Sequence, residues 1–301
     1  MSQTFPHNTE MFTLATSGYV PFVLNLHESL KRVGLGDHLV AYTLDDESDR
    51  ALTVAGLTCR RFAGGVERAW SNWRTTGFQK IMEAKYSVAL NLLRAGRHVL
   101  HVDSDIVFLK NPMSYLQDVM ARSSAHLVLQ SESPQNSYNA GFWFASPAPQ
   151  VIEVFSDIQS TLRREEHWTC DQRLLNERVR QSNVLKTHAL DPALFACGNQ
   201  FLEEKRKRHF DPAGPPFDTE AAYLLHFNFI IGMETKVLAM KKHGALMFPG
   251  LEQYGPSFRR TCIRRAEAVR TALSGQPVTA WPRLLSRLVG DQAGKRPARI
   301  G

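Results

Sequence analysis

Short apolar runs alternate with longer amphipathic segments between residues 11 and 163, and this alternation narrows the choice of fold more than any other feature of the chain. The apolar runs have the length of buried strands, and the segments between them have helical spacing. Such an order predicts an α/β domain with an open, mostly parallel, Rossmann-like central sheet and helices on both faces. We expect strands at 11–16, 38–44, 57–62, 99–102, 125–130 and 141–145, and helices at 18–34, 73–96 and 148–163.

The stretch "VLHVDSDIVFLKNP", residues 99–112, places the carboxylates of Asp103 and Asp105 at the carboxyl end of a predicted strand, with only Ser104 between them. Neighbouring negative charges framed by apolar residues repel each other and are costly to desolvate. Ligands of open α/β sheets bind at the carboxyl ends of strands. Mg²⁺ or Mn²⁺ bound there would offset the repulsion and the desolvation cost of the two carboxylates. An aspartate that only caps the turn is the alternative interpretation of either residue.

Later motifs carry polar or small residues beside apolar segments. His226 could serve as a third metal ligand, since an imidazole suits Mn²⁺. Gly232 could let a backbone N–H approach a phosphate, and Lys236 could supply a positive charge to it. The alternatives are a buried core histidine and a solvated lysine. The motifs are "YNAGFWFAS" with Asn139, "WTCDQRLLNE" with Asp171 and Gln172, and "LLHFNFIIGMETK" with His226, Asn228, Gly232 and Lys236.

In this order, the motifs resemble the nucleotide-diphospho-sugar transferase family of GT-A glycosyltransferases, family 77, and more distantly the glycogenin and lipopolysaccharide galactosyltransferase group, family 8. The resemblance runs from residue 11 to about residue 245. It implies a GT-A fold, a UDP-sugar donor, Mn²⁺ or Mg²⁺ as cofactor, and transfer of the sugar to a hydroxyl acceptor on a glycan, a lipid-linked saccharide or a protein. It also implies that the anomeric configuration is mostly retained.

The resemblance also implies a role for each motif residue. Asp103, Asp105 and His226 would hold the metal. Asn139, Asp171 and Gln172 would face the sugar and the reacting carbon, with Asp171 as a nucleophile or a ligand of sugar hydroxyls and the Gln172 carbonyl beside the reacting carbon. The positions matched to donor binding are Thr16, Ser17 and Tyr19 near the uridine, Lys80 or Lys85 as the basic residue, and Ser104, Asn228, Gly232 and Lys236 around the diphosphate.

Two other functions fit a chain of this kind. A sugar nucleotidyltransferase would need a glycine-rich N-terminal phosphate loop followed by a basic residue, and "LATSGYVPF" has one glycine and no such base. A catalytically silent binding module would be expected to lose Asp103, Asp105 or His226, and the chain has all three. The last motif departs from the distant group, because Asn228 intrudes and no Pro-Trp follows Lys236. This favours the family 77 interpretation.

The net charge of +7 is concentrated after Lys205. Nucleic-acid binding would need basic residues interleaved with aromatics or a reading helix, and neither is present, so we expect no nucleic-acid partner. Residues 258–289 combine arginines with leucines and Trp281. Such a segment fits a helix that packs its leucines on the domain with its arginines in water, and the alternative is a peripheral contact with an anionic membrane. We expect a catalytic domain at 1–250 and a basic helical extension at 251–301.

The remaining features concern the compartment. The N-terminus has no basic region followed by an apolar core, which predicts the absence of a signal peptide. No apolar stretch approaches the roughly eighteen residues of a membrane span. Four cysteines are scattered without a C-x-x-C pair, which predicts reduced thiols. We therefore expect a cytoplasmic protein.

Overall fold

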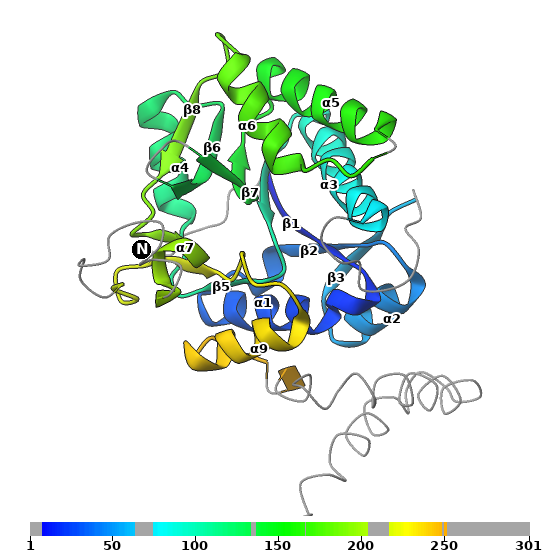
Figure 1. The fold of residues 1–301 in the computed structure, drawn as a ribbon, viewed down its shortest axis with the longest axis vertical. Helices are drawn as coiled ribbons and strands as arrows, with labels where there is room; N and C mark the ends of the chain where they lie inside the picture. The colour runs from blue at the N-terminus through cyan, green and yellow to red at the C-terminus, as the bar shows by residue number, and fades with distance from the viewer. Residues whose placement is uncertain are drawn as a thin grey trace, which may run out of the picture. The chain divides into compact units, whose positions relative to one another are not determined.

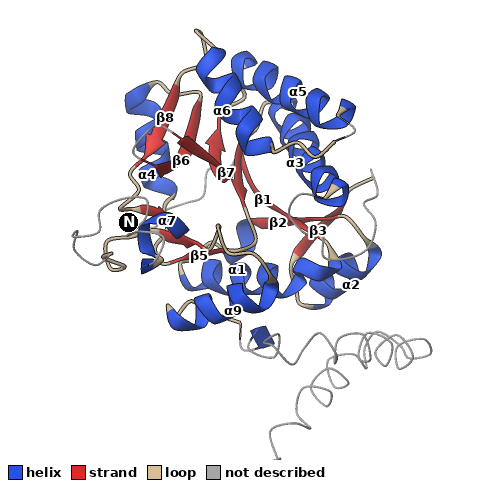
Figure 2. Cartoon of the chain, viewed as in Figure 1, coloured by secondary structure: helices blue, strands red, loops and turns tan. Residues whose placement is uncertain are grey.

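The computed structural model describes residues 8–63, 75–133, 137–165, 167–203, 217–248 and 250–251. A seven-stranded sheet with helices on both sides forms the centre of this part (Figures 1 and 2). The predicted α/β class and mostly parallel sheet are confirmed. The predicted extension at 251–301 lies almost wholly outside the described residues. In spatial order the strands are β3 (Thr58–Arg61), β2 (Leu39–Thr43), β1 (Thr9–Ala15), β4 (His98–Val102), β7 (Ser137–Ala145), β6 (Leu127–Ser133) and β8 (Thr187–Leu190).

The sheet is mixed because β7 runs antiparallel to both of its neighbours, β4 and β6, whereas the remaining neighbours pair in parallel. A second sheet of three short strands adjoins the carboxyl end of β4. In it, β10 (Leu224–His226) pairs antiparallel with β5 (Ile106–Phe108) and parallel with β9 (Phe195–Cys197). The sequence indicated apolar runs at β5 and β10 but not that they pair with each other.

The helices divide between the two faces of the large sheet. Side chains of α1, α2 and α4 pack with one buried cluster, and those of α3, α5 and α6 pack with the other. The helices are α1 (Val20–Arg32), α2 (Asp46–Val54), α3 (Thr76–Arg94), α4 (Met113–Ser123), α5 (Pro149–Arg164), α6 (Asp171–Gln181), α7 (Gly198–Phe201) and α9 (Met233–Lys242), with short 3-10 turns at Ser17–Tyr19 and Gly36–His38. No helix in the described ranges has both the length and the apolar character that a membrane crossing requires.

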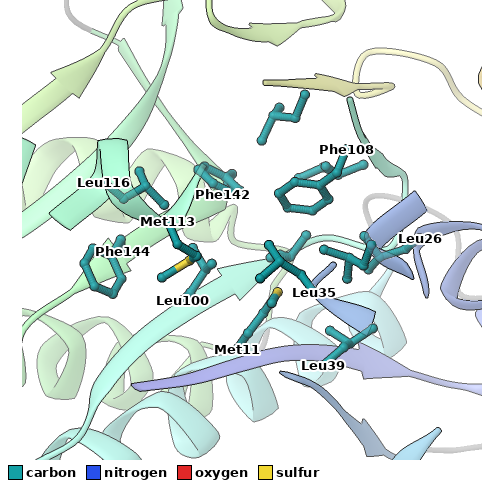
Figure 3. Close-up of a cluster of buried hydrophobic side chains, with 14 of the residues drawn as sticks. Met11, Leu26, Leu35, Leu39, Leu100, Phe108, Met113, Leu116, Phe142 and Phe144 are labelled. Carbon is teal, nitrogen blue, oxygen red and sulfur yellow. The ribbon is translucent and has the colours of Figure 1, made fainter. Parts of the chain in front are cut away.

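Strand alternation supplies both cores. On β7, Phe142 and Phe144 point into the first cluster, which is drawn in Figure 3, while Trp143 points into the second. Leu100 on β4 joins the first cluster and Val99 the second. A strand buried on both faces reads as a continuous apolar run, which is why the sequence located β4 and the end of β7 correctly.

A buried asparagine fixes the segment that follows α9. Asn25 on α1 donates from Nδ2 to the Ala245 carbonyl (3.1 Å), and its Oδ1 accepts from the backbone N–H groups of Met247 (2.7 Å) and Phe248 (3.0 Å). In Figure 1, α9 lies beside α1. Since α9 carries Lys236, this anchor helps to hold a predicted site residue in place.

Replacing Asn25 by Ala should lower the free energy of unfolding by about 3 kcal/mol, because each buried polar group left without a partner costs roughly 1–3 kcal/mol. Urea unfolding measures the change. Asn91→Ala is the control, since Asn91 is exposed on α3 and a surface change is worth about 0.5 kcal/mol or less. Equal stability of the Asn25 and Asn91 variants would contradict the anchoring role.

Candidate metal and donor site

Three potential metal ligands converge where the two sheets meet. Asp103 directly follows β4, Asp105 directly precedes β5, and His226 is the last residue of β10. The pairing of β10 with β5 sets His226 opposite Ile106, and the Phe227 N–H donates to the Asp105 carbonyl (3.0 Å). One ligand atom from each of the three side chains lies within 4.8 Å of the others. The small sheet therefore brings together residues that are more than a hundred positions apart in sequence.

The ligand set is open on one side and closed on the other. The side chain of Asp103 is 43% exposed, whereas that of Asp105 is 12% and that of His226 is 1% exposed. His226 Nε2 lies 3.2 Å from Asp105 Oδ1 and 3.8 Å from Asp103 Oδ2. The Lys236 ammonium lies 2.5 Å from Asp105 Oδ2. This geometry leaves Asp103 facing the cleft, where a bound ion could take further ligands from a substrate.

Hydrogen bonds determine which nitrogen of His226 faces the carboxylates. Gln130 on β6 donates from Nε2 to the Phe195 carbonyl (3.1 Å), which directs its Oε1 at His226 Nδ1 (2.8 Å). Nδ1 then carries the proton, and Nε2 presents its lone pair to the two aspartates. Three electron-rich atoms that converge in this way fit a divalent cation that accepts oxygen and imidazole ligands.

Replacing Gln130 by Leu should weaken Mn²⁺ binding by about tenfold, because the hydrogen-bond partner that orients a ligating histidine typically contributes 10–100-fold to metal affinity. Calorimetric titration of Mn²⁺ in the presence of UDP measures the change. Gln159→Leu is the matched control, since Gln159 lies on α5 and its side chain donates to Ser87 Oγ, far from the metal ligands in sequence. Unchanged Mn²⁺ affinity in the Gln130 variant would show that His226 needs no such partner.

A second buried histidine supports Asp103. His101 on β4 approaches Asp103 Oδ1 with Nε2 (3.0 Å) and is 1% exposed. Burial lowers the pKa of His101 despite the opposing effect of Asp103, so the imidazole is neutral at neutral pH and donates a hydrogen bond to the carboxylate. His101 thus orients a metal ligand without adding a positive charge.

Both aspartates are ionised at neutral pH. Burial alone would raise the pKa of Asp103, but the hydrogen bond from His101 and the charge of Lys85 lower it to about 2. Burial acts on Asp105 in the same direction, and the positive charge of Lys236 holds the pKa of its carboxyl well below the ordinary value. Metal ligands of this kind must be deprotonated, so the surroundings prepare the pair for a cation.

Lys85 forms the next layer of the site. Its ammonium pairs with the Asp171 carboxylate and donates to the Ala140 carbonyl (3.1 Å), and both side chains of the ion pair are less than a tenth exposed. Burial lowers the pKa of Lys85, but Asp171 and Asp103 outweigh it and raise that pKa. The ion pair therefore joins α3 to the first residue of α6 with a charged lysine between two carboxylates.

A cleft of about 500 Å³ contains these groups. Phe22, Phe78, Ile81 and Met82 give part of its wall an apolar character. Tyr19 also lines the cleft, and burial together with the charges of Asp105 and Asp103 raises the pKa of its hydroxyl. The predicted site residues in the cleft wall are Thr16, Tyr19, Lys85, Asp103, Ser104, Asp105, Asn139, Asp171, Gln172, His226, Asn228, Gly232 and Lys236.

Two predicted donor-binding residues lie elsewhere. Lys80 is exposed, and it borders a separate hollow next to Glu83 and Arg163 instead of the cleft. Ser17 does not line the cleft either, and its backbone N–H donates to the Asp45 side chain (2.8 Å). Of the two lysines considered as the basic donor residue, only Lys85 is in the cleft.

Several residues of the site were not identified from the sequence. His101, Gln130 and Glu132 are buried, and each contacts a predicted site residue. Gln130 and Glu132 alternate along the polar end of an otherwise apolar strand, so they face the same side of β6. Their spacing of two residues was the one signal in the sequence that could have identified Gln130 and Glu132.

Comparison with known proteins establishes the family to which a chain with this fold and site belongs. The family model for nucleotide-diphospho-sugar transferases matches residues 34–240, more than half of the chain, so the chain belongs to this family. Among solved structures, it is similar to the WbbM bifunctional glycosyltransferase (TM-score 0.52, 11% identity, 84% of this chain and 52% of that one). It is also similar to the galactosyltransferase LgtC (TM-score 0.50, 12% identity, 79% of this chain and 95% of that one). These likenesses show a GT-A-like fold.

Two curated relatives come from Arabidopsis thaliana. The chain is 26% identical to the arabinosyltransferase RRA2 over 200 residues, which cover 57% of the chain and 45% of the relative. It is 24% identical to the beta-arabinofuranosyltransferase RAY1 over 277 residues, which cover 84% of the chain and 49% of the relative. The chain thus spans about half the length of the curated relatives it matches.

Proposed function

We propose that this protein is a metal-dependent glycosyltransferase that moves a sugar from a UDP-sugar to a hydroxyl of a glycan, a lipid-linked saccharide or a protein, with retention of configuration. The observation that carries the proposal is the convergence of Asp103, Asp105 and His226 within 4.8 Å beside Lys236, in the wall of a cleft. Family membership supports the nucleotide-sugar donor. The names of the relatives favour a pentose, arabinose, as the transferred sugar.

Asp103, Asp105 and His226 would hold Mn²⁺ or Mg²⁺, which when bound neutralises charge that develops on a departing diphosphate. Lys236 is placed to contribute a second positive charge at the same end of the cleft. Groups aimed at charge that develops in the transition state usually make the largest contribution to catalysis. Lys85 and Asp171 would orient hydroxyls of the sugar near Asp103. The departing phosphate oxygen would then accept the proton of the acceptor hydroxyl on the face that it leaves.

Release of UDP from a panel of donors, with and without Mn²⁺, tests the proposal. The panel contains UDP-arabinose in its pyranose and furanose forms, UDP-xylose, UDP-galactose and UDP-glucose. We expect UDP release that requires the metal and is fastest with one form of UDP-arabinose. Formation of pyrophosphate from a sugar phosphate and UTP would instead favour a nucleotidyltransferase. Binding of UDP and Mn²⁺ without turnover of any donor, over a range of acceptors, would favour a binding module.

A further inference from the structure

Glu132 on β6 is a buried carboxylate in the same cleft that no sequence motif singled out. It is 8% exposed and lines the cleft. The other cleft carboxylates have charged or imidazole partners, because Asp103 contacts His101, Asp105 contacts Lys236, and Asp171 contacts Lys85. Within the described ranges, Glu132 contacts only uncharged hydrogen-bond donors and forms no ion pair.

The backbone determines how those donors are oriented. The Gly141 N–H donates to Asn139 Oδ1 (2.7 Å), which turns Asn139 Nδ2 toward Glu132 Oε1 (3.1 Å) and Gln172 Oε1 (3.0 Å). The Ala140 N–H also points at Gln172 Oε1 (3.4 Å). Gln172 Nε2 must then face Glu132 Oε2, and it does so at 2.6 Å. Neither amide can be reversed without setting two donors against each other.

This arrangement favours an ionised Glu132, because Asn139 and Gln172 each donate an N–H to one of its oxygens and the Ser137 hydroxyl donates to Oε2 (3.3 Å). Burial raises the pKa of Glu132, and the hydrogen bonds from Asn139 and Gln172 oppose that rise. A buried anion without a cationic partner is costly, and such costs are typical of groups that act on a ligand. The unmatched negative charge is therefore available to a positive charge brought by the substrate.

The same hydrogen bonds engage both the oxygen and the nitrogen of the Gln172 side-chain amide. Its carbonyl oxygen already accepts from Asn139 and Ala140, so the sequence-based hypothesis that this oxygen faces the reacting carbon does not fit the arrangement. We propose that Glu132 is the group that stabilises the positive charge on the transferred carbon as its bond to the diphosphate breaks, and that Gln172 and Asn139 are positioning residues. The bonding electron pair leaves with the diphosphate, and Glu132 forms no covalent bond. This inference rests on the proposed function.

A cationic iminosugar tests the charge directly, without turnover. The probe is 1,4-dideoxy-1,4-imino-L-arabinitol, titrated calorimetrically into the protein saturated with UDP and Mn²⁺, with arabinose as the neutral comparison. Glu132→Gln should weaken iminosugar binding at least tenfold and leave the affinity for UDP with Mn²⁺ within about twofold. Glu153→Gln, on the exposed side of α5, should change neither. Equal iminosugar affinity in the wild type and Glu132→Gln would overturn the proposal.

Conservative variants separate a charge from a structural contact. Since both oxygens of Glu132 accept hydrogen bonds, Gln sets an amide N–H against Asn139 or Gln172, so a structural role predicts an equal loss of affinity for the iminosugar and for neutral arabinose. The proposal predicts a loss confined to the iminosugar, with Glu132→Asp, which keeps the charge, retaining at least tenfold more iminosugar affinity and a higher kcat than Glu132→Gln. If Glu132→Gln does not fold, Glu132→Asn against Glu132→Asp gives the same comparison between two side chains of one size.

The outcomes also distinguish this inference from the proposed function. A wild type that turns over a UDP-sugar, together with a Glu132→Gln variant whose kcat is unchanged, would overturn the inference alone. A wild type that releases UDP from no donor would overturn the proposed function, and the inference with it. A fall of roughly 100-fold in kcat with a donor KM within about threefold would support both.

Discussion

Replacing Asp103 by Asn should remove Mn²⁺-dependent turnover, with a fall in kcat of at least roughly 100-fold, while the protein stays folded. The amide keeps the shape of the side chain and still offers an oxygen to His101 Nε2, which now lies 3.0 Å from Asp103 Oδ1. What disappears is the negative charge of the most exposed ligand. Calorimetry of Mn²⁺ with UDP measures the loss of metal binding independently of any donor.

The unfolding midpoint of this variant should fall modestly, because the folded protein favours the charge of Asp103: His101 and Lys85 outweigh burial and the repulsion from Asp105. Asp157→Asn is the control for the removal of a carboxylate. Asp157 pairs with Arg178 at the surface, and such pairs contribute about 0–1 kcal/mol. Turnover and metal affinity at wild-type levels in the Asp103 variant would rule out the ligand assignment.

Replacing Gly141 by Ala should weaken Mn²⁺ binding toward the upper end of a 10–100-fold range, although no ligand is removed. A Cβ at this position would overlap Asp103 Oδ2 and lie 2.6 Å from His226 Cε1. Contacts this short force the carboxylate or the imidazole to move, and His226 is closely held by Gln130. Asp103 would therefore be displaced from the arrangement in which the three ligands converge.

Gly56→Ala is the matched control, since it is the same chemical change where a Cβ would meet nothing within 4 Å. Gly56 has a φ of +85°, so alanine there should cost about 1–2 kcal/mol of stability without affecting the metal. Gly141→Ala should show the opposite pattern. If both variants lose stability and neither loses Mn²⁺ affinity, the close approach of Gly141 has no role in the site.

The sequence predicted the site best where its parts are local. Asp103 and Asp105 follow a strand that is buried on both faces, so the apolar run located them and the fold rule placed them at the ligand-binding edge. His226 was also proposed as a ligand. Its position depends on the pairing of β10 with β5, which are only three residues each, and strands this short carry too little periodicity for a register to be inferred.

The amide network could not be predicted for a different reason. Whether Gln172 presents its oxygen or its nitrogen to the cleft depends on the backbone N–H groups of residues 140 and 141, which belong to β7. That strand runs antiparallel to β4, whereas the alternation of strands and helices indicated only a mostly parallel sheet. The resemblance to a family identified Gln172 as a site residue. Its hydrogen bonds depend on the position of β7, which only the structure shows.

Three consecutive residues of β7 connect the two ends of the cleft. Asn139 bonds to Glu132 and Gln172 at the sugar end, and the Gly141 carbonyl accepts from the Asp103 N–H at the metal end (2.7 Å). Since strand residues advance by roughly 3.3 Å each, this tripeptide sets a constant spacing between the Asp103 end of the cleft and the Asn139 side chain, and so between the diphosphate and the sugar of the proposed donor. Attempts to change the accepted sugar should therefore leave residues 139–141 intact and vary cleft residues that do not bond to them.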